Sequence, residues 1–470
     1  MMRRSLSLFA TTVSLALLSA CASFSPDRGM GEVSQATKAA IGEDAVARRD
    51  ADAAAQADAQ VRQLLRRPLT ADSAVRIALL SNRALQAAYG ELALAEADKV
   101  QESLPPNPTL SLSRIAGGGA VEIERQVVVD ILALATLPAR SEIARQRFAA
   151  AQWRAVEATL RLAADVRRAH ARAVAASELV ALLVETKDTA EAIAKLATKL
   201  GETGGLNKLD QAREQVFYAE TTAELGAARQ EAMRTREALT RLLGLWGEDI
   251  AFRLPQALPA LPRPPTLPEV EVAAVGRRAD LQAARLSLTA LASSLELTQA
   301  SRFVSLLDLA GVSKTTREGG GTLRERGLDV QLQVPLFDGG EVRVRQATET
   351  YNAALNRLTD QAVRVRSEAR EAYRAYRASY DIAQHYQREV LPLRKVIAQE
   401  MQLRFSGMQV DVFALVTEAR QRVAAQRAAI AAKRDVFLAQ ADLSAAINGG
   451  GRGEGSEAQP AAGATAAATD

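Results

Sequence analysis

Leu85-Gln86-Ala87-Ala88 recurs 196 residues further along the chain as Leu281-Gln282-Ala283-Ala284. Each copy lies in a helix-compatible segment that ends at a glutamine, Gln101 or Gln299, just before residues of strand character. Self-similarity at a fixed interval is the signature of a duplicated structural unit. The sequence therefore predicts two half-chains with the same order of elements.

Each half is predicted to hold two strands followed by two long helices. The strands are expected near residues 108–114, 120–130, 303–312 and 327–335, and the helices near residues 139–200, 206–243, 340–402 and 411–447. A helix of about 62 residues would be about 93 Å long, so it is expected to lie beside others in a bundle or tube. Pro392 is expected to kink the long helix of the second half.

The composition excludes several classes of protein. The 59 basic and 55 acidic residues are interleaved along the helical segments, which is typical of solvated helix faces, and no basic arm indicates nucleic-acid binding. The two histidines, His170 and His385, are expected on helix surfaces and, with a single cysteine, leave little material for a catalytic triad or a metal cluster. No phosphate loop or nucleophile elbow occurs. We therefore expect no enzyme, and neither a metal nor another cofactor.

The first residues are typical of an export signal. Arg3 and Arg4 precede an apolar run, Leu6–Leu18, that is too short to cross a bilayer. Leu18-Ser19-Ala20-Cys21 resembles a bacterial lipobox, in which the cysteine thiol is acylated and the chain is cleaved before it. The resemblance implies that residues 1–20 are a signal peptide and that Cys21 carries acyl chains, which anchor firmly when there are two or three of them. A plain secretory signal is the alternative.

Apolar and polar residues alternate along the predicted strands. Leu328, Val330 and Leu332 alternate with Asp329 and Gln331, so one face of this strand is apolar and the other polar. A half-buried sheet of a soluble protein would give the same pattern. An exported chain that has no spanning helix, however, can cross the outer membrane only as a closed barrel, for which about eight strands are the practical minimum. Four strands in one chain therefore imply that several chains share the barrel.

One octapeptide, Val334-Pro335-Leu336-Phe337-Asp338-Gly339-Gly340-Glu341, joins a strand to a long helix through a Gly turn. It resembles the strand-to-helix junction of TolC-type outer-membrane efflux proteins. The residues that carry this resemblance are Pro335, Phe337, Gly339 and Gly340. The corresponding segment of the first half, residues 134–140, keeps Pro138 but lacks the Phe-Asp-Gly-Gly portion.

Residues 79–85 and 277–281 resemble the opening helices of the same family, so the resemblance extends over about residues 68–447. It implies a mainly α fold with a membrane β-barrel, in which four strands per chain contribute to a trimeric, twelve-stranded barrel and the long helices form a hollow α-barrel across the periplasm. It also implies a homotrimeric, passive channel in the cell outer membrane, served by a periplasmic adaptor protein and an inner-membrane pump. Nucleic acid is not among the implied partners.

The family's channels close at the periplasmic tip, where the long helices reverse direction. The glycines expected to form these tip turns are Gly201, Gly204, Gly205 and Gly407. The charged residues that are candidates for the periplasmic gate are Lys208, Asp210, Arg404 and Asp411. Three copies of an aspartate could form a ring that attracts cations. The alternative is that these residues are helix caps or solvated charges.

The sequence is thereby divided into six segments. They are a signal peptide (1–20), a lipid anchor and N-terminal tether with an Ala-rich helix near 43–65 (21–67), a first repeat (68–253), a Pro-rich linker (254–268), a second repeat (269–448) and a tail that is expected to be disordered (449–470). The main rival to a channel is a periplasmic coiled-coil adaptor or structural lipoprotein without a pore. The duplicated strand pair between helices argues against this rival.

Overall fold

The computed structural model describes residues 24–262 and 269–450. They form two compact units, each of which draws on both halves of the duplicated sequence. The strand unit contains residues 24–33, 88–155 and 280–363, and the helical unit contains residues 34–87, 156–262, 269–279 and 364–450. The predicted signal peptide, Cys21, the end of the predicted linker and the tail beyond residue 450 lie outside the described residues.

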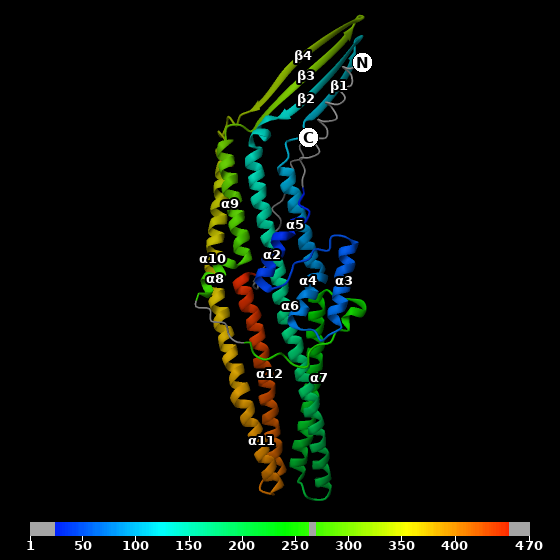
Figure 1. Cartoon of the computed structure of the whole chain (residues 1–470), viewed down its shortest axis with the longest axis vertical. Coiled ribbons are helices and arrows are strands. Elements are labelled where there is room, and N and C mark those ends of the chain that lie inside the picture. Colours follow the sequence, from blue (N-terminus) through cyan, green and yellow to red (C-terminus); the bar gives the residue numbers. More distant parts are fainter. Residues whose placement is uncertain (1–23, 263–268, 451–470) are drawn as a thin grey trace. The chain divides into compact units, whose positions relative to one another are not determined.

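Long helices and four strands make up the two units (Figure 1). In chain order the elements are α2 (Met30–Ile41), α3 (Ala51–Leu65), α4 (Ala71–Ser81), α5 (Arg83–Glu102), β1 (Thr109–Gly117), β2 (Ala120–Asp130), α6 (Ile131–Glu202), α7 (Lys208–Leu243), η1 (Gly247–Ile250), α8 (Val270–Arg277), α9 (Ala279–Ala300), β3 (Leu306–Glu318), β4 (Gly321–Gln333), α10 (Glu341–His385), η2 (Tyr386–Val390), α11 (Leu391–Ser406) and α12 (Val412–Asn448). The duplicated order of helix, two strands and two long helices is present. Within the two described ranges, no helix is both long enough and apolar enough to cross a membrane.

The strand unit contains one antiparallel sheet with the order β1-β2-β3-β4. The central β2–β3 pair joins the two halves of the chain, with Ala120 opposite Glu318 and Asp130 opposite Asp308. Both hairpins close through two glycines with positive φ, at 118–119 and 319–320, as a type I′ turn requires. Strands β3 and β4 therefore run closer to the turn than the predicted ranges 303–312 and 327–335, because the Gly-Gly turn lets them pair as far as Glu318 and Gly321.

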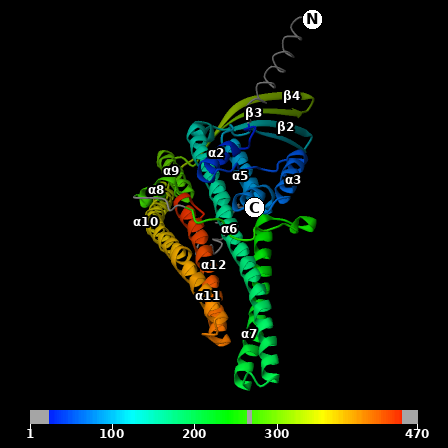
Figure 2. The ribbon, with the colours of Figure 1, turned by 60° about the horizontal axis from the view of Figure 1, so that its bottom comes forward.

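The helical unit contains two helical hairpins, α6–α7 and α11–α12 (Figures 1 and 2). Alanines and leucines fill the spaces between these helices. Leu183 of α6 packs on Leu225 and Ala228 of α7. Small buried side chains allow helices to approach closely, which explains why an Ala-rich sequence with few aromatic residues still buries a core.

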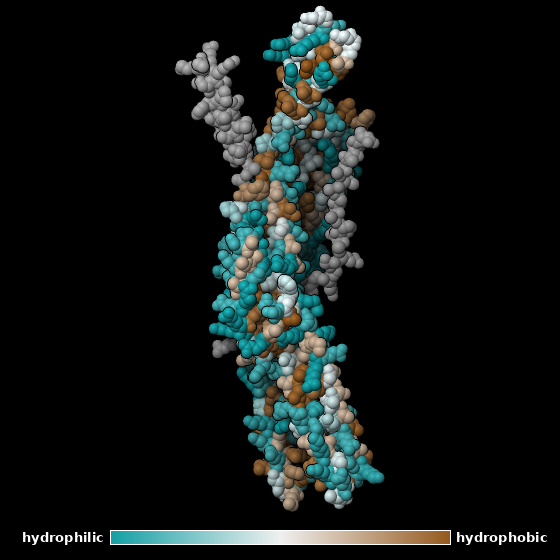
Figure 3. All heavy atoms as spheres, turned by 90° about the vertical axis from the view of Figure 1, so that its right-hand side faces the viewer, coloured by the Kyte–Doolittle hydropathy of each residue, from teal (hydrophilic) through white to brown (hydrophobic). Residues whose placement is uncertain are grey.

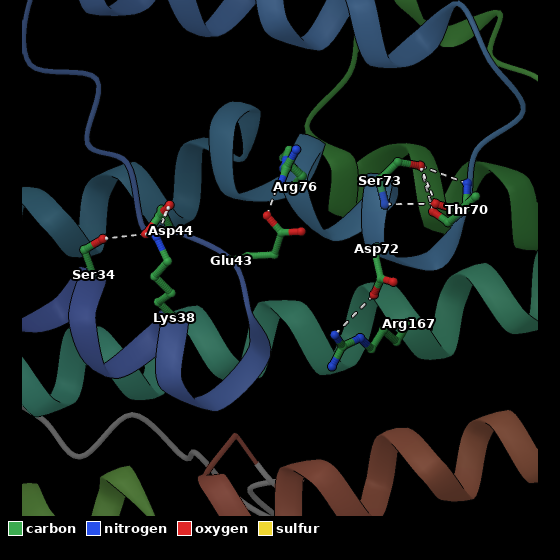
Figure 4. Close-up of polar contacts among 9 residues, drawn as sticks. All are labelled: Ser34, Lys38, Glu43, Asp44, Thr70, Asp72, Ser73, Arg76 and Arg167. Carbon is green, nitrogen blue, oxygen red and sulfur yellow. Dashed lines mark hydrogen bonds and ion pairs between the residues drawn. The ribbon is translucent and has the colours of Figure 1, made fainter. Parts of the chain in front are cut away.

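Residues 34–67 belong to the helical unit and make polar contacts with α4 (Figure 4). Glu43 pairs with Arg76 of α4 at 2.8 Å. The predicted helix near 43–65 begins later, at Ala51, because the Asp50 side chain accepts a hydrogen bond from the Ala53 amide and so caps the helix there.

Two further polar contacts in the same region involve α4: one joins it to α6, and the other caps its first turn. Asp72 of α4 pairs with Arg167 of α6 at 3.4 Å, and Thr70 and Ser73 form a reciprocal capping box at the start of α4 (Figure 4). A capping box satisfies two backbone amides that the first helical turn leaves without partners. These contacts explain why α4 starts at Ala71.

The two prolines within the long helices have different effects. Helix α6 begins at Ile131 and contains Pro138, so residues 134–140 are helical and do not form a second junction turn. The Asp130 carboxylate accepts a hydrogen bond from the Ala133 amide at 2.8 Å and thereby starts the helix early. At Pro392 the predicted disturbance takes the form of a π-helical turn, η2, because proline cannot donate to the carbonyl four residues before it.

His170 corrects another expectation. Its ring is buried, and its Nε2 atom lies 2.6 Å from the carbonyl oxygen of Leu69, so this histidine does not lie on a helix surface. Burial lowers the pKa of the His170 imidazole below 6.5. His385, in contrast, is exposed and lies 3.1 Å from the Glu389 carboxylate.

Candidate functional site

The sheet has two faces of different chemistry. Because opposed residues of paired strands point to the same side, the strand register assigns every residue to a face. The apolar face carries Leu110, Leu112, Val121, Ile123, Val127, Val129, Leu307, Leu309, Leu328, Val330 and Leu332. The acidic face carries Glu122, Glu124, Asp130, Asp308, Glu318, Glu325 and Asp329, with Lys314 as its one basic residue.

The apolar face lies open in a single chain. Leu110, Leu112 and Leu328 are more than two thirds exposed. Every residue of the two edge strands, β1 and β4, is exposed as well. An open sheet edge presents unpaired backbone groups that are free to pair with another strand.

The junction after β4 depends on a close approach of two backbone segments. Gly339 and Gly340 both have positive φ, and a Cβ atom on Gly340 would lie 2.1 Å from the carbonyl oxygen of Arg302. The Arg302 guanidinium donates to the Gly339 carbonyl at 3.2 Å and pairs with Glu341 at 3.2 Å. These contacts explain why the Gly pair stands where β4 turns into α10.

Two further junction residues are positioned at the base of the sheet. Pro335 lies two residues after Gln333, the last paired residue of β4, and Phe337 is fully exposed. Leu336 beside it is also largely exposed. Bulky apolar side chains are thus exposed close to the end where the strands join the helices.

The tip turns connect α6 to α7 and α11 to α12. Gly201 lies in the last turn of α6, Gly204 has a φ of +76°, and the Gly205 amide donates to Leu200. In the second turn Gly407 ends α11 with a φ of −85°, and the left-handed residue is Met408, at +56°. The Gly407 amide donates to the carbonyl of Leu403.

Three of the four candidate gate residues have partners within their own hairpin. Asp210 pairs with Arg213 at 3.0 Å, and Arg404 pairs with Glu400 at 3.0 Å. The Asp411 carboxylate caps α12 by accepting from the Ala414 amide at 2.8 Å. Lys208 is the first residue of α7. Their role in a gate remains a prediction.

Sequence reasoning missed a pair that joins the two hairpins. The Arg420 guanidinium of α12 lies 3.5 Å from the buried carboxylate of Glu214 on α7, and 4.3 Å from the centre of the Phe217 ring. It also donates to the carbonyl of Arg213 at 3.4 Å. Burial raises the pKa of the Glu214 carboxyl, while the nearby Arg420 charge opposes that rise.

A second pair joins the two helices of the other hairpin. Arg394 of α11 donates to the buried Glu418 carboxylate of α12 at 3.1 Å and to Gln421 at 2.7 Å. A third, Arg427 with Glu224, joins α12 to α7 at 2.8 Å, but both side chains are well exposed. Over residues 24–262 and 269–450, no group of three or more His, Cys, Asp or Glu residues is arranged to hold a metal ion.

In each half of the duplicated chain, two strands of the open-edged sheet stand in sequence between a shorter helix and the long helices. Residues 272–449 match the family model described as outer membrane efflux protein. This match and the fold confirm the resemblance to TolC-type outer-membrane efflux proteins and the predicted fold class. A comparison with curated protein sequences gave no match.

Solved structures share the fold over most of the chain. The CmeC outer membrane channel of Campylobacter jejuni is 15% identical with a TM-score of 0.69, over 82% of this chain and 87% of that chain. The outer membrane protein VceC of Vibrio cholerae is 16% identical with a TM-score of 0.66, over 86% and 99%. The MtrE outer membrane channel of Neisseria gonorrhoeae, in its open state, is 18% identical with a TM-score of 0.65, over 81% and 89%.

Proposed function

We propose that this protein is the outer-membrane channel of a tripartite efflux or secretion system. Three copies form a passive conduit from the periplasm to the exterior, with no chemistry of their own. The observation that carries this proposal is the four-stranded sheet with one apolar face, one acidic face and two unpaired edges. The matched family is one of efflux proteins and not of enzymes.

The sheet supports this function through its edges and faces. In a membrane every backbone polar group needs a partner, so a sheet can cross only when it is closed on itself. Four strands are too few to close, whereas β4 of one copy can pair with β1 of the next until three copies complete twelve strands. The apolar face then contacts lipid, and the acidic face lines a water-filled lumen.

The helices support association of several copies. Their surface is mainly hydrophilic, but hydrophobic patches interrupt it (Figure 3). On α11, for example, Leu393, Val396 and Leu403 are exposed. Neighbouring copies packed side by side would cover such patches, as in a hollow tube of helices.

The tip would open by separation of the two hairpins within each copy. The Arg420–Glu214 pair holds α12 to α7, and splaying the helices must break it. Lys208, Asp210, Arg404 and Asp411 lie at the hairpin ends, where three copies could meet around the axis. We assign the gate to these residues together with the Arg420–Glu214 pair.

The proposed function also requires a lipid anchor and two partner proteins. Acyl chains on Cys21 would hold the protein in the outer membrane, as the lipobox-like residues before it imply. A periplasmic adaptor would join the tip to an inner-membrane pump that supplies the energy. The chain then needs no cofactor.

Conductance in planar bilayers tests this function. The full protein, purified with its anchor from outer membranes, is expected to give discrete channel openings and the mass of a trimer in detergent. A monomer that gives no conductance, even when the Arg420–Glu214 pair is removed, would instead favour a periplasmic coiled-coil protein without a pore.

A further inference from the structure

Five arginines interrupt the apolar face of the sheet near its hairpin turns. They are Arg114, Arg125, Arg317, Arg324 and Arg326. All five side chains are exposed. The register places them in the three rows of this face that lie closest to the turns, with Arg125 and Arg326 in one row and Arg114 and Arg324 in the next. We call this set the arginine band.

The carboxylates of the sheet are confined to one of its two faces. The strands place no aspartate or glutamate on the apolar face, whereas the acidic face holds seven. The carboxylates therefore point away from the arginine band. Within the described part of the chain, none of the five arginines takes part in an ion pair. Guanidinium groups with this exposure and no carboxylate on their own face are available to an external anion.

The position of the band along the strands agrees with the boundary of a membrane. Ser305, whose amide pairs with Gln333, marks the base of the sheet, and Ser313 stands in the first row that contains arginines. These eight residues span about 27 Å along the strand, or about 21 Å across a membrane at a tilt of about 40°. Leu336 and Phe337, a few residues beyond the base, are exposed as well. The band thus begins close to the far edge of an apolar belt about 25 Å tall.

The spacing within the band suits phosphate groups. Arg324 and Arg326 stand about 7 Å apart on one strand, and Arg114 and Arg125 about 8 Å apart on the diagonal between two strands. A guanidinium binds phosphate through two parallel N–H···O bonds, which lysine cannot provide. Pairing of β4 with β1 of the next copy would continue the band around a closed barrel.

We infer that the arginine band binds the phosphate groups of lipids in the outer leaflet, at the boundary between acyl chains and headgroups. This inference rests on the proposed function, because the apolar face must contact lipid. The occupant is a phosphorylated lipid and not free phosphate, since the acyl chains of the same molecule would lie on Leu112, Leu328 and Val330 directly beneath the guanidinium groups.

Lipid binding to the full protein in neutral detergent tests the inference. The probe is a diphosphorylated acylated disaccharide, lipid A, compared with its dephosphorylated form and with inorganic phosphate. The test variant replaces the band by glutamine: R114Q, R125Q, R317Q, R324Q and R326Q. The matched control removes five exposed arginines from helices: R229Q, R241Q, R345Q, R357Q and R366Q.

The wild type and the control variant are expected to bind diphosphorylated lipid A at least tenfold more tightly than the band variant does, and binding should weaken with added salt. Equal affinity in the band and control variants, equal binding of the dephosphorylated lipid, or full competition by millimolar inorganic phosphate would overturn the inference. If the band variant does not fold, the difference between the affinities of the wild type for the two lipids still tests the inference. Wild-type conductance in phosphatidylcholine bilayers, measured separately, reports the proposed function alone.

Discussion

Substitution R420A is expected to open the resting channel. The change removes three interactions of one guanidinium, with the Glu214 carboxylate, the Phe217 ring and the Arg213 carbonyl. The Glu214 side chain is 5% exposed and that of Arg420 is 41% exposed. Breaking a fully buried pair costs about 3 to 5 kcal/mol and an exposed pair about 0 to 1 kcal/mol, so we take about 2 kcal/mol for this half-exposed case.

The size of the effect follows from the closed-to-open equilibrium. If the pair exists only while α12 lies against α7, about 2 kcal/mol changes the ratio of open to closed tips by about 30-fold per chain. Single-channel recording in planar bilayers measures that ratio as open probability. Replacing Glu214 as well, in E214Q/R420A, should reverse part of the change in folding stability, because no carboxylate is then left buried without its cation.

The matched control is R427A. Arg427 joins the same two helices through Glu224, and its contact is shorter, 2.8 Å against 3.5 Å for the Arg420 pair. Its side chains are, however, 40% and 45% exposed, so its loss should change open probability by no more than about fivefold. An R427A channel that opens as much as R420A would refute the argument that burial decides which pair holds the tip closed. So would an R420A channel that stays as closed as the wild type.

Three further predictions address the junction, the buried histidine and the anchor. G340A should lower the free energy of unfolding by more than about 3 kcal/mol, because its Cβ would meet the Arg302 carbonyl oxygen. G339A should lower it by about 1 to 2 kcal/mol, because only its positive φ is unfavourable for alanine. Denaturant unfolding of the two variants measures both changes. Because burial lowers the pKa of His170, the unfolded chain binds a proton at this residue at a higher pH than the folded chain does. The stability of the wild type should therefore fall relative to that of H170Q as the pH decreases below 6.5. Melting temperatures of the two proteins that change equally between about pH 7 and pH 5 would contradict this. C21S should yield a protein without acyl chains, and an acylated C21S product in intact-mass measurement would show that the anchor is elsewhere.

Local patterns in the sequence predicted most of the fold. The repeated Leu-Gln-Ala-Ala fixed the duplication, and the alternation along Leu328 to Leu332 identified the strand and its apolar face. Both signals depend only on neighbouring residues and on fixed periods. The ends of the helices were predicted less accurately, because individual capping contacts decide where each helix begins. The Asp130 cap starts α6 before Pro138, although a proline suggests a helix start at its own position.

The candidate site was only partly predictable because its contacts join distant parts of the chain. Glu214 and Arg420 are 206 residues apart, and neither stands in a motif. Comparison of the two halves would have offered a signal, since α7 and α12 occupy corresponding positions in the repeat. His170 was misjudged for a similar reason: its acceptor, the Leu69 carbonyl, belongs to a segment 101 residues away.

The arginine band and the open edges together bear on how the protein assembles. A single chain leaves β1 and β4 unpaired and exposes the leucines of the apolar face to water, which is unfavourable. Pairing with a strand of another copy satisfies the open edges, whereas only contact with lipid removes the exposed leucines from water. Arginines at the turn end resist entry into the acyl region, yet they must cross it if the turns are to reach the far side. In the proposed trimer, closing the barrel and inserting it should therefore be coupled, because a complete ring satisfies both edges of every sheet while the charged turns cross together.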